Sequence, residues 1–157
     1  MKALSITGPR EIPNDKIEYV RQELCREIEQ AIADGFTRFL SSMLNNVDLD
    51  FAAIVEEKKK ENPELFLEAV IPYSDRMKSK EKRFQKLIKE CNSVKVISQE
   101  RDRDCYFARN RYLVENSQRV IAVSDDGQKS DTAQTIRMAV AKGLELHVID
   151  IAEDTNK

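Results

Sequence analysis

The sequence predicts a single α/β domain with a mostly parallel sheet and helices on both faces. Short apolar runs of strand length alternate with longer segments in which apolar residues recur at helical spacing. The links between them are short and contain Gly, Pro, Asn or Asp. The chain has 157 residues, a length that suits one domain with one core. We therefore expect the domain to span residues 1–151, followed by a short tail over residues 152–157.

The first half of the chain contains three of the expected strands and two of the helices. Apolar runs predict the strands at residues 2–7, 36–40 and 65–71. Asn14 or Asp15 can cap the first helix, and Gly35 follows its end, as a glycine often does. Its apolar positions have helical spacing: Ile17, Val20, Leu24, Ile28 and Ile32. Asp48 is a candidate cap for the second helix, which Asn62-Pro63 ends.

The second half repeats the same alternation. Apolar side chains at helical spacing predict a helix around residues 84–91, and a short strand follows at residues 94–97. A helix over residues 105–116 leads into an apolar strand at residues 120–123. The last helix buries Ile136, Ala139 and Val140, Gly143 closes it, and the final strand covers residues 144–151.

Composition narrows the classes of function. The 26 Lys and Arg nearly balance the 28 Asp and Glu, so no positive field attracts nucleic acid or a membrane surface. No apolar run has the length of a bilayer span, and the N-terminus lacks the apolar middle of a signal peptide. Three cysteines without CxxC spacing indicate a reducing, cytoplasmic setting. The one histidine, His147, lies in a strand pattern, so we expect no metal site and no cofactor.

The candidate site follows from the fold class, because ligands of open parallel sheets bind at the carboxyl ends of the strands. Gly8 permits close backbone approach there, and Arg10 offers a fork of donors to an anion. The Ser41-Ser42 loop and Ser130-Asp131-Thr132 both precede helices, whose free N–H groups favour negative charge. Structural alternatives stay open: a simple turn at residues 7–10, and helix caps at Asp48, Ser130 and Asp131.

Arg109-Asn110-Arg111 lies on the helix before the strand at residues 120–123. Arginines beside a buried strand are costly unless an anionic or carbonyl-rich group pairs with them. We interpret this helix as one wall of a ligand site, with exposed helix charges as the alternative. Cys105 on the same helix is either a thiol activated by nearby positive charge or a buried apolar side chain.

Five segments of the chain form recognisable motifs, which are, in order, Thr7-Gly8-Pro9-Arg10, Ser41-Ser42-Met43…Val47-Asp48…Ala52, Ala69-Val70-Ile71-Pro72-Tyr73, Arg109-Asn110-Arg111-Tyr112-Leu113-Val114 and Asp131-Thr132…Thr135. Together they resemble the YpsA/YoqJ-like branch of the SLOG superfamily, which also contains the Smf/DprA proteins and the Lonely-guy phosphoribohydrolases. The resemblance extends from near Ala3 to near Asp150. The resemblance implies a single Rossmann-like domain that binds a nucleotide or a nucleotide-derived ligand, and a homodimer.

The sequence also departs from the family pattern. Ser42 and Asn46 stand where family members have glycines, although Asn tolerates the left-handed conformation that glycine supplies. Ser130-Asp131-Thr132 replaces Gly-Gly-Thr, and a carboxylate beside a phosphate weakens binding unless a cation or an arginine intervenes. The glutamate of the phosphoribohydrolase motif is absent from the corresponding residues 130–135. We therefore expect binding rather than catalysis.

The leading hypothesis is a cytoplasmic, bacterial or phage protein that senses or sequesters a nucleotide or an NAD- or ADP-ribose-derived ligand. One alternative is a hydrolase of an N-glycosidic or phosphate bond that uses Asp48, Asp125 or Asp131. Another is a diverged interaction protein without a ligand, and direct DNA binding through the basic residues 77–86 is a weaker one. We expect no catalytic residue and these ligand-binding residues: Gly8, Arg10, Ser41, Ser42, Asp48, Pro72, Arg109, Asn110, Asp125, Ser130, Asp131 and Thr132.

Overall fold

Six parallel strands form one sheet in the computed structural model, which describes residues 2–127 and 129–152. The spatial order of the strands is β4-β3-β2-β1-β5-β6, and every neighbouring pair is parallel. Their bounds are β1 Lys2–Thr7, β2 Phe36–Ser41, β3 Phe66–Tyr73, β4 Ser93–Ser98, β5 Arg119–Ser124 and β6 Glu145–Asp150. The predicted fold class is confirmed.

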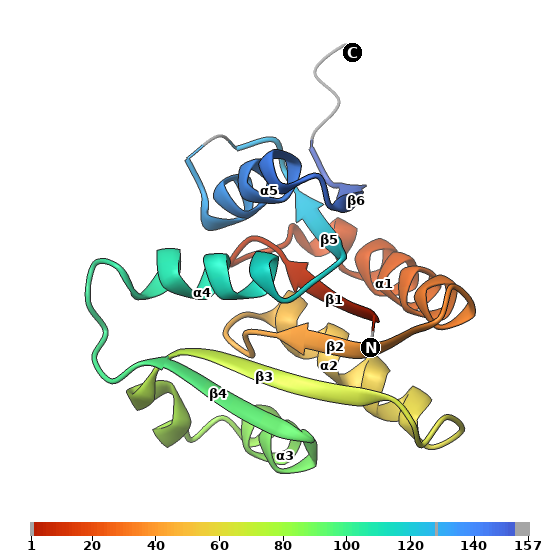
Figure 1. Cartoon of the computed structure of the whole chain (residues 1–157), viewed down its shortest axis with the longest axis horizontal. Helices are drawn as coiled ribbons and strands as arrows, with labels where there is room; N and C mark the ends of the chain where they lie inside the picture. The colour runs from red at the N-terminus through yellow and green to blue at the C-terminus, as the bar shows by residue number, and fades with distance from the viewer. Residues whose placement is uncertain (1, 128, 153–157) are drawn as a thin grey trace.

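Helices cover both faces of the sheet (Figure 1). On one face lie α1, α2 and α3, and on the other lie α4 and α5, which contact each other. Their bounds are α1 Ile17–Ala33, α2 Asn46–Lys59, α3 Lys82–Glu90, α4 Cys105–Glu115 and α5 Asp131–Lys142, with short 3-10 turns at Asn14–Lys16 and Ser74–Lys78. This division follows from the right-handedness of each strand–helix–strand connection.

The chain reverses its direction across the sheet at β1. Strands β1 to β4 are added outward in one direction, and α4 then carries the chain back to β5 on the other side of β1. The loops after β1 and β5 therefore lead to opposite faces of the sheet and leave a crevice between them. Such a reversal is where open α/β sheets bind ligands.

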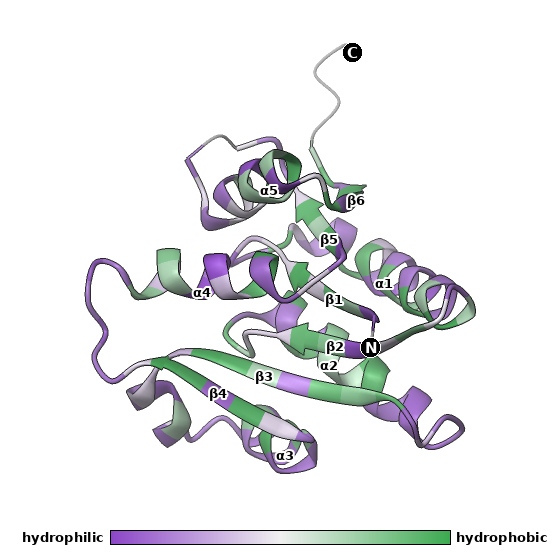
Figure 2. Ribbon diagram, viewed as in Figure 1, coloured by the Kyte–Doolittle hydropathy of each residue, from purple (hydrophilic) through white to green (hydrophobic). Residues whose placement is uncertain are grey.

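The larger core lies between the sheet and α1 to α3. Aliphatic side chains make up most of it, and among its phenylalanines the rings of Phe39 and Phe51 pack with centroids 6.1 Å apart. Figure 2 shows hydrophobic residues along the central strands and hydrophilic residues on the outward sides of the helices. Burial of apolar surface contributes about 25 cal/mol per Å² to the free energy of folding and is the main source of stability for such a layer.

A buried polar cluster attaches α4 to the opposite face. Glu68 on β3 is 6% exposed and accepts a 2.6 Å hydrogen bond from the Tyr112 hydroxyl on α4. Arg38 on β2 forms a 2.7 Å ion pair with the same carboxylate. A buried charge needs such partners to offset its desolvation, so this cluster fixes where α4 crosses the sheet.

Four local predictions were wrong. Val140, expected on the buried side of α5, is 63% exposed. The first helix has no side-chain cap at Asn14 or Asp15, because a 3-10 turn over Asn14–Lys16 precedes it. The N-cap of α2 is Asn45, and Asp48 lies three residues inside it. Strand β3 continues through Pro72 to Tyr73, since the fixed φ of proline is compatible with extended backbone. The predicted tail lies outside the described residues, except for Ala152.

None of the helices in residues 2–127 and 129–152 is long and apolar enough to cross a membrane.

Candidate functional site

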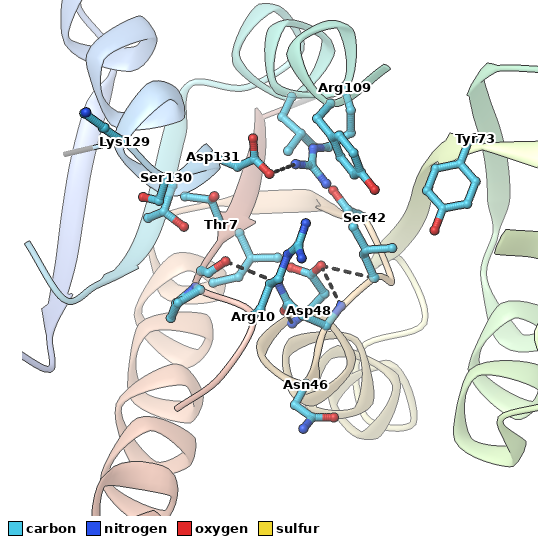
Figure 3. A pocket seen from close by; sticks show the side chains of 18 of the residues that line it. Thr7, Arg10, Ser42, Asn46, Asp48, Tyr73, Arg109, Lys129, Ser130 and Asp131 are labelled. Carbon is cyan, nitrogen blue, oxygen red and sulfur yellow. Dashed lines mark hydrogen bonds and ion pairs between the residues drawn. The ribbon is translucent and has the colours of Figure 1, made fainter. Parts of the chain in front are cut away.

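A cleft of about 630 Å³ opens at the carboxyl ends of β1 and β5, where the strand order reverses. Its walls are the loops after β1 and β2, the end of β3, one side of α4 and the N-terminus of α5 (Figure 3). Eight residues predicted from the sequence line it: Gly8, Arg10, Ser42, Asp48, Arg109, Ser130, Asp131 and Thr132. Segments from four separate parts of the chain thus meet in one cavity.

The other four predicted residues lie outside the lining. Ser41 and Asn110 are buried supports, since Ser41 Oγ donates to the Asp48 carbonyl at 2.9 Å and Asn110 contacts Arg109. Pro72 lies within β3. Asp125 lines a neighbouring cavity beside Ile12 and accepts a hydrogen bond from the Gly127 N–H at 2.9 Å. Direct ligand contact by these four stays a prediction.

Gly8 brings the loop after β1 against the start of α2. A Cβ placed on Gly8 would lie 2.8 Å from Val47 Cγ1, much closer than carbon atoms normally approach. Asn45 Nδ2 also donates to the Gly8 carbonyl at 3.2 Å. The glycine is therefore required for helix packing, a role that the sequence did not distinguish from close approach to a phosphate.

Asp48 holds the turn at the start of α2. Its Oδ2 accepts hydrogen bonds from the N–H groups of Leu44 at 3.1 Å and Asn45 at 3.2 Å, and its own N–H donates to Asn45 Oδ1 at 2.9 Å. This reciprocal pair is a capping box. The side chain is 3% exposed, and burial raises its pKa, opposed by the charge of Arg109 and by the two backbone N–H groups.

The left-handed residue of the second loop is Met43, with φ +57°, and not Asn46, which is the first residue of α2. Arg76 stabilises this conformation, because its Nε and Nη2 donate to the Met43 carbonyl at 2.9 and 2.6 Å. The Arg76 guanidinium also lies 4.3 Å from the centre of the Phe84 ring. The loop shape that family glycines would supply is maintained here by a distant arginine.

Arg109 connects α4 to the N-terminus of α5. It is 6% exposed, its Nε donates to Asn110 Oδ1 at 2.8 Å, and its Nη2 lies 3.7 Å from Asp131 Oδ2. Asn110 Nδ2 in turn donates to Gln134 Oε1 at 2.8 Å. Arg109 thus offsets the negative charge of Asp131, which would otherwise repel an anion at this helix start.

The first turn of α5 presents polar groups to the cleft. Ser130 is the N-cap, and its Oγ accepts a hydrogen bond from the Ala133 N–H at 3.0 Å. Thr132 is 4% exposed, and its Oγ1 has no hydrogen-bond partner among the described residues. A buried hydroxyl without a partner is unusual and costs free energy, so Thr132 is a polar group that the described part of the chain leaves unsatisfied. The N–H groups at this helix start and its dipole favour an anion.

Several residues that line the cleft were not predicted from the sequence. Tyr73 ends β3, Tyr106 lies in the first turn of α4, and Arg101 precedes that helix. The two tyrosine rings pack edge to face, with centroids 6.2 Å apart. The only sequence signal was the three-residue spacing of Tyr106 and Arg109, which places both on one helix face. Thr7, Asn45, Asn46 and Lys129 complete the missed polar lining.

The carboxylates do not form an acid–base pair. Asp48 accepts backbone hydrogen bonds, Asp131 pairs with Arg109, and Asp125 lies in the neighbouring cavity. Within the described part of the chain, no group of three His, Cys, Asp or Glu side chains is placed to hold a metal ion. Cys105 is buried, and burial raises its pKa, so it has the apolar packing role rather than that of an activated thiol.

The fold and the position of the cleft define a Rossmann-like α/β domain. A family model described as YpsA, the YspA SLOG family, matches residues 10–153. The chain therefore belongs to this SLOG family, as its motifs predicted.

A solved structure supports the fold. It is the X-ray structure of TM1055, a structural genomics target, and its TM-score to this chain is 0.61 at 16% sequence identity. The match covers 93% of this chain and 72% of that one. At this level of identity the likeness shows the fold alone. No curated protein matches the sequence.

Proposed function

We propose that this protein binds a nucleotide or an NAD- or ADP-ribose-derived ligand in the cleft, as a sensor or a sequestering protein. The position of the cleft carries the proposal, because it opens where the strand order reverses and against the start of α5. The Thr132 hydroxyl, which has no hydrogen-bond partner among the described residues, supports it. It lies in the first turn of a twelve-residue helix whose N-terminus opens into the cleft. A phosphate oxygen at this helix start would accept hydrogen bonds from the hydroxyl and from free backbone N–H groups, so the ligand would satisfy these donors.

The charge of the lining supports an anionic ligand. Four cationic side chains line the cleft, Arg10, Arg101, Arg109 and Lys129, against the two carboxylates of Asp48 and Asp131. Arg109 is nearly buried, so its field is screened less than that of a surface charge. A phosphate or pyrophosphate would offset the excess positive charge.

Binding without catalysis is part of the proposal. Each carboxylate that a hydrolase would need already has a structural partner, as described above. The homodimer that the resemblance implies and the cytoplasmic location that the cysteines indicate also belong to it. Size-exclusion chromatography with light scattering measures the oligomeric state.

The test is a thermal-shift screen with AMP, ADP, ATP, NAD, ADP-ribose and cyclic ADP-ribose isomers. A ligand present at about 100 times its Kd adds about 2.7 kcal/mol to the unfolding free energy, which gives a readily measured rise in Tm. Thr132→Val should leave the stability of the free protein unchanged or higher, because it removes an unpaired buried hydroxyl. It should reduce the ligand-induced shift.

Thr135→Val is the matched control. The Thr135 hydroxyl is buried but donates to the Asp131 carbonyl at 3.0 Å. Its removal should therefore destabilise the free protein, and the ligand-induced shift should persist. If no nucleotide raises the Tm of the wild type, the proposal is wrong and the diverged interaction protein takes its place.

A further inference from the structure

The cleft has two chemically different ends. Figure 3 shows Lys129 and Ser130 at one end and Tyr73 at the other, with Arg10 and Asp48 between them. The first end carries the start of α5, and the second carries the aromatic side chains. A ligand that fills the whole cleft must therefore have two unlike parts.

The aromatic end is built from two elements that are far apart in sequence. Tyr73 is the last residue of β3, and Tyr106 is the second residue of α4. Both are only partly buried and line the cleft, and their planes are inclined at 82°. Edge-to-face packing of this kind fixes each ring relative to the other.

Two arginines hold the rings in place. The Arg101 guanidinium lies 5.4 Å from the centre of the Tyr73 ring, and its Nε donates to the Tyr106 hydroxyl at 3.1 Å. The Arg109 guanidinium lies 5.6 Å from the centre of the Tyr106 ring. Such contacts attract the cation to the negative face of the ring. The rings are therefore ordered before a ligand arrives, which lowers the entropic cost of binding.

The Tyr73 hydroxyl stays neutral in the physiological range. Burial, followed by the neighbouring Tyr106, raises the pKa of the Tyr73 hydroxyl. Aromatic rings that line a cleft suit a planar heterocycle better than a phosphate, because every nucleobase presents a π-face to stack. The phosphate is better placed at the start of α5, where the hydroxyl of Thr132 has no partner among residues 2–127 and 129–152.

From the separation of these two ends, we infer that the ligand lies across the cleft in one orientation, with its phosphate at the start of α5 and its base against Tyr73 and Tyr106. This orientation rests on the proposed function and adds to it the direction of the ligand and the part of the protein that binds the base. The base end and the phosphate end should accordingly be separable by mutation.

The experiment is calorimetric titration with AMP, ribose 5-phosphate and adenosine, which carry both parts, the phosphate alone and the base alone. Tyr106→Leu removes a ring. We expect it to weaken the affinity for AMP about tenfold or more and to leave the affinity for ribose 5-phosphate unchanged. Tyr106→Phe keeps the ring and should retain most of the AMP affinity. Thr132→Val should weaken the binding of AMP and of ribose 5-phosphate to the same extent, and it should leave the affinity for adenosine unchanged.

Fluorescence supplies a second readout, because the chain has no tryptophan and four tyrosines. AMP should quench this emission more than ribose 5-phosphate does, and the difference should shrink in Tyr106→Leu. Tyr19→Leu is the control, since Tyr19 is an exposed residue of α1 that is absent from the cleft lining. It should leave the difference intact.

The outcomes separate the two proposals. If AMP and ADP-ribose bind but Tyr106→Leu weakens ribose 5-phosphate as much as AMP, the inferred orientation is wrong and the proposed function stands. Loss of adenosine binding in Thr132→Val would overturn the orientation too. If the wild type binds neither AMP nor ADP-ribose nor NAD, both proposals are wrong.

Discussion

Replacement of Gly8 by alanine should destabilise the protein by overpacking the contact between the first loop and α2. The added methyl group would lie 2.8 Å from Val47 Cγ1, 3.1 Å from its Cβ and 3.2 Å from its Cγ2. Carbon atoms prefer separations of about 3.5–4.0 Å. Val47 is 1% exposed and belongs to the main core, so it cannot move into solvent.

Overpacking of a tight core typically costs about 1–3 kcal/mol. For a domain of this size, that corresponds to a fall in Tm of about 2–12 °C. Urea unfolding of the Gly8→Ala variant measures the loss directly, with an unchanged m-value as evidence that the transition stays two-state. The same variant should bind ligand more weakly. Asp48, which lines the cleft, belongs to α2 and would be displaced together with that helix.

A double-mutant cycle with Val47→Ala tests the stated cause. Removal of the two Val47 γ-carbons makes room for the new methyl group, so the double variant should be more stable than the sum of the single effects by about 0.5–2 kcal/mol. Gly35→Ala is the control, because a Cβ there meets nothing within 4 Å and only the backbone at φ +92° is strained. Additive effects for Gly8→Ala with Val47→Ala would refute the overpacking explanation.

Three further outcomes follow from the same structure. Arg76→Ala should destabilise the protein by about 1.5–3 kcal/mol in urea unfolding, since both donors to the Met43 carbonyl are lost; an unchanged midpoint would contradict this role. The raised pKa of Asp48 means that the folded state binds its proton more tightly than the unfolded state, so stability falls as the pH rises above the ordinary value of 3.8. Asp48→Asn should remove that fall: as the pH is lowered from neutral towards 3.8, the wild type should gain stability relative to the variant, and a constant difference would refute the assignment. Burial raises the pKa of the Cys91 thiol to about 12, so iodoacetamide at pH 8 should label it only after unfolding, as mass spectrometry would show. Rapid labelling of the native protein would contradict the raised pKa of this half-buried thiol.

The strand and helix pattern was predictable because it depends on local spacing. Apolar runs in β3 and β5 identified buried parallel strands, and the helical spacing of Val20, Leu24 and Ile28 identified the buried side of α1. Helix ends were predicted less well, as Asn45 shows, because a capping box contains two candidate polar residues and sequence does not rank them.

Most of the candidate site was predictable from the topology rule, since the carboxyl ends of parallel strands lie at one edge of the sheet. That rule predicted Gly8, Ser42 and Thr132 at one cleft, and the cost of an unpaired arginine beside a buried strand added Arg109. The separate function of each residue was not predictable. Asn110, for example, orients Arg109 and contacts Gln134 rather than lining the cavity.

The sequence by itself determined the fold class, the family and the edge of the sheet where a ligand would bind, because these depend on periodicity and on short motifs. Only the tertiary structure decided that Arg76 supports the left-handed Met43 and that Tyr73 and Tyr106 form one wall. Only the structure revealed that the Thr132 hydroxyl has no partner among the described residues. Each of these features depends on contacts between residues distant in the chain, whose distances no local pattern encodes.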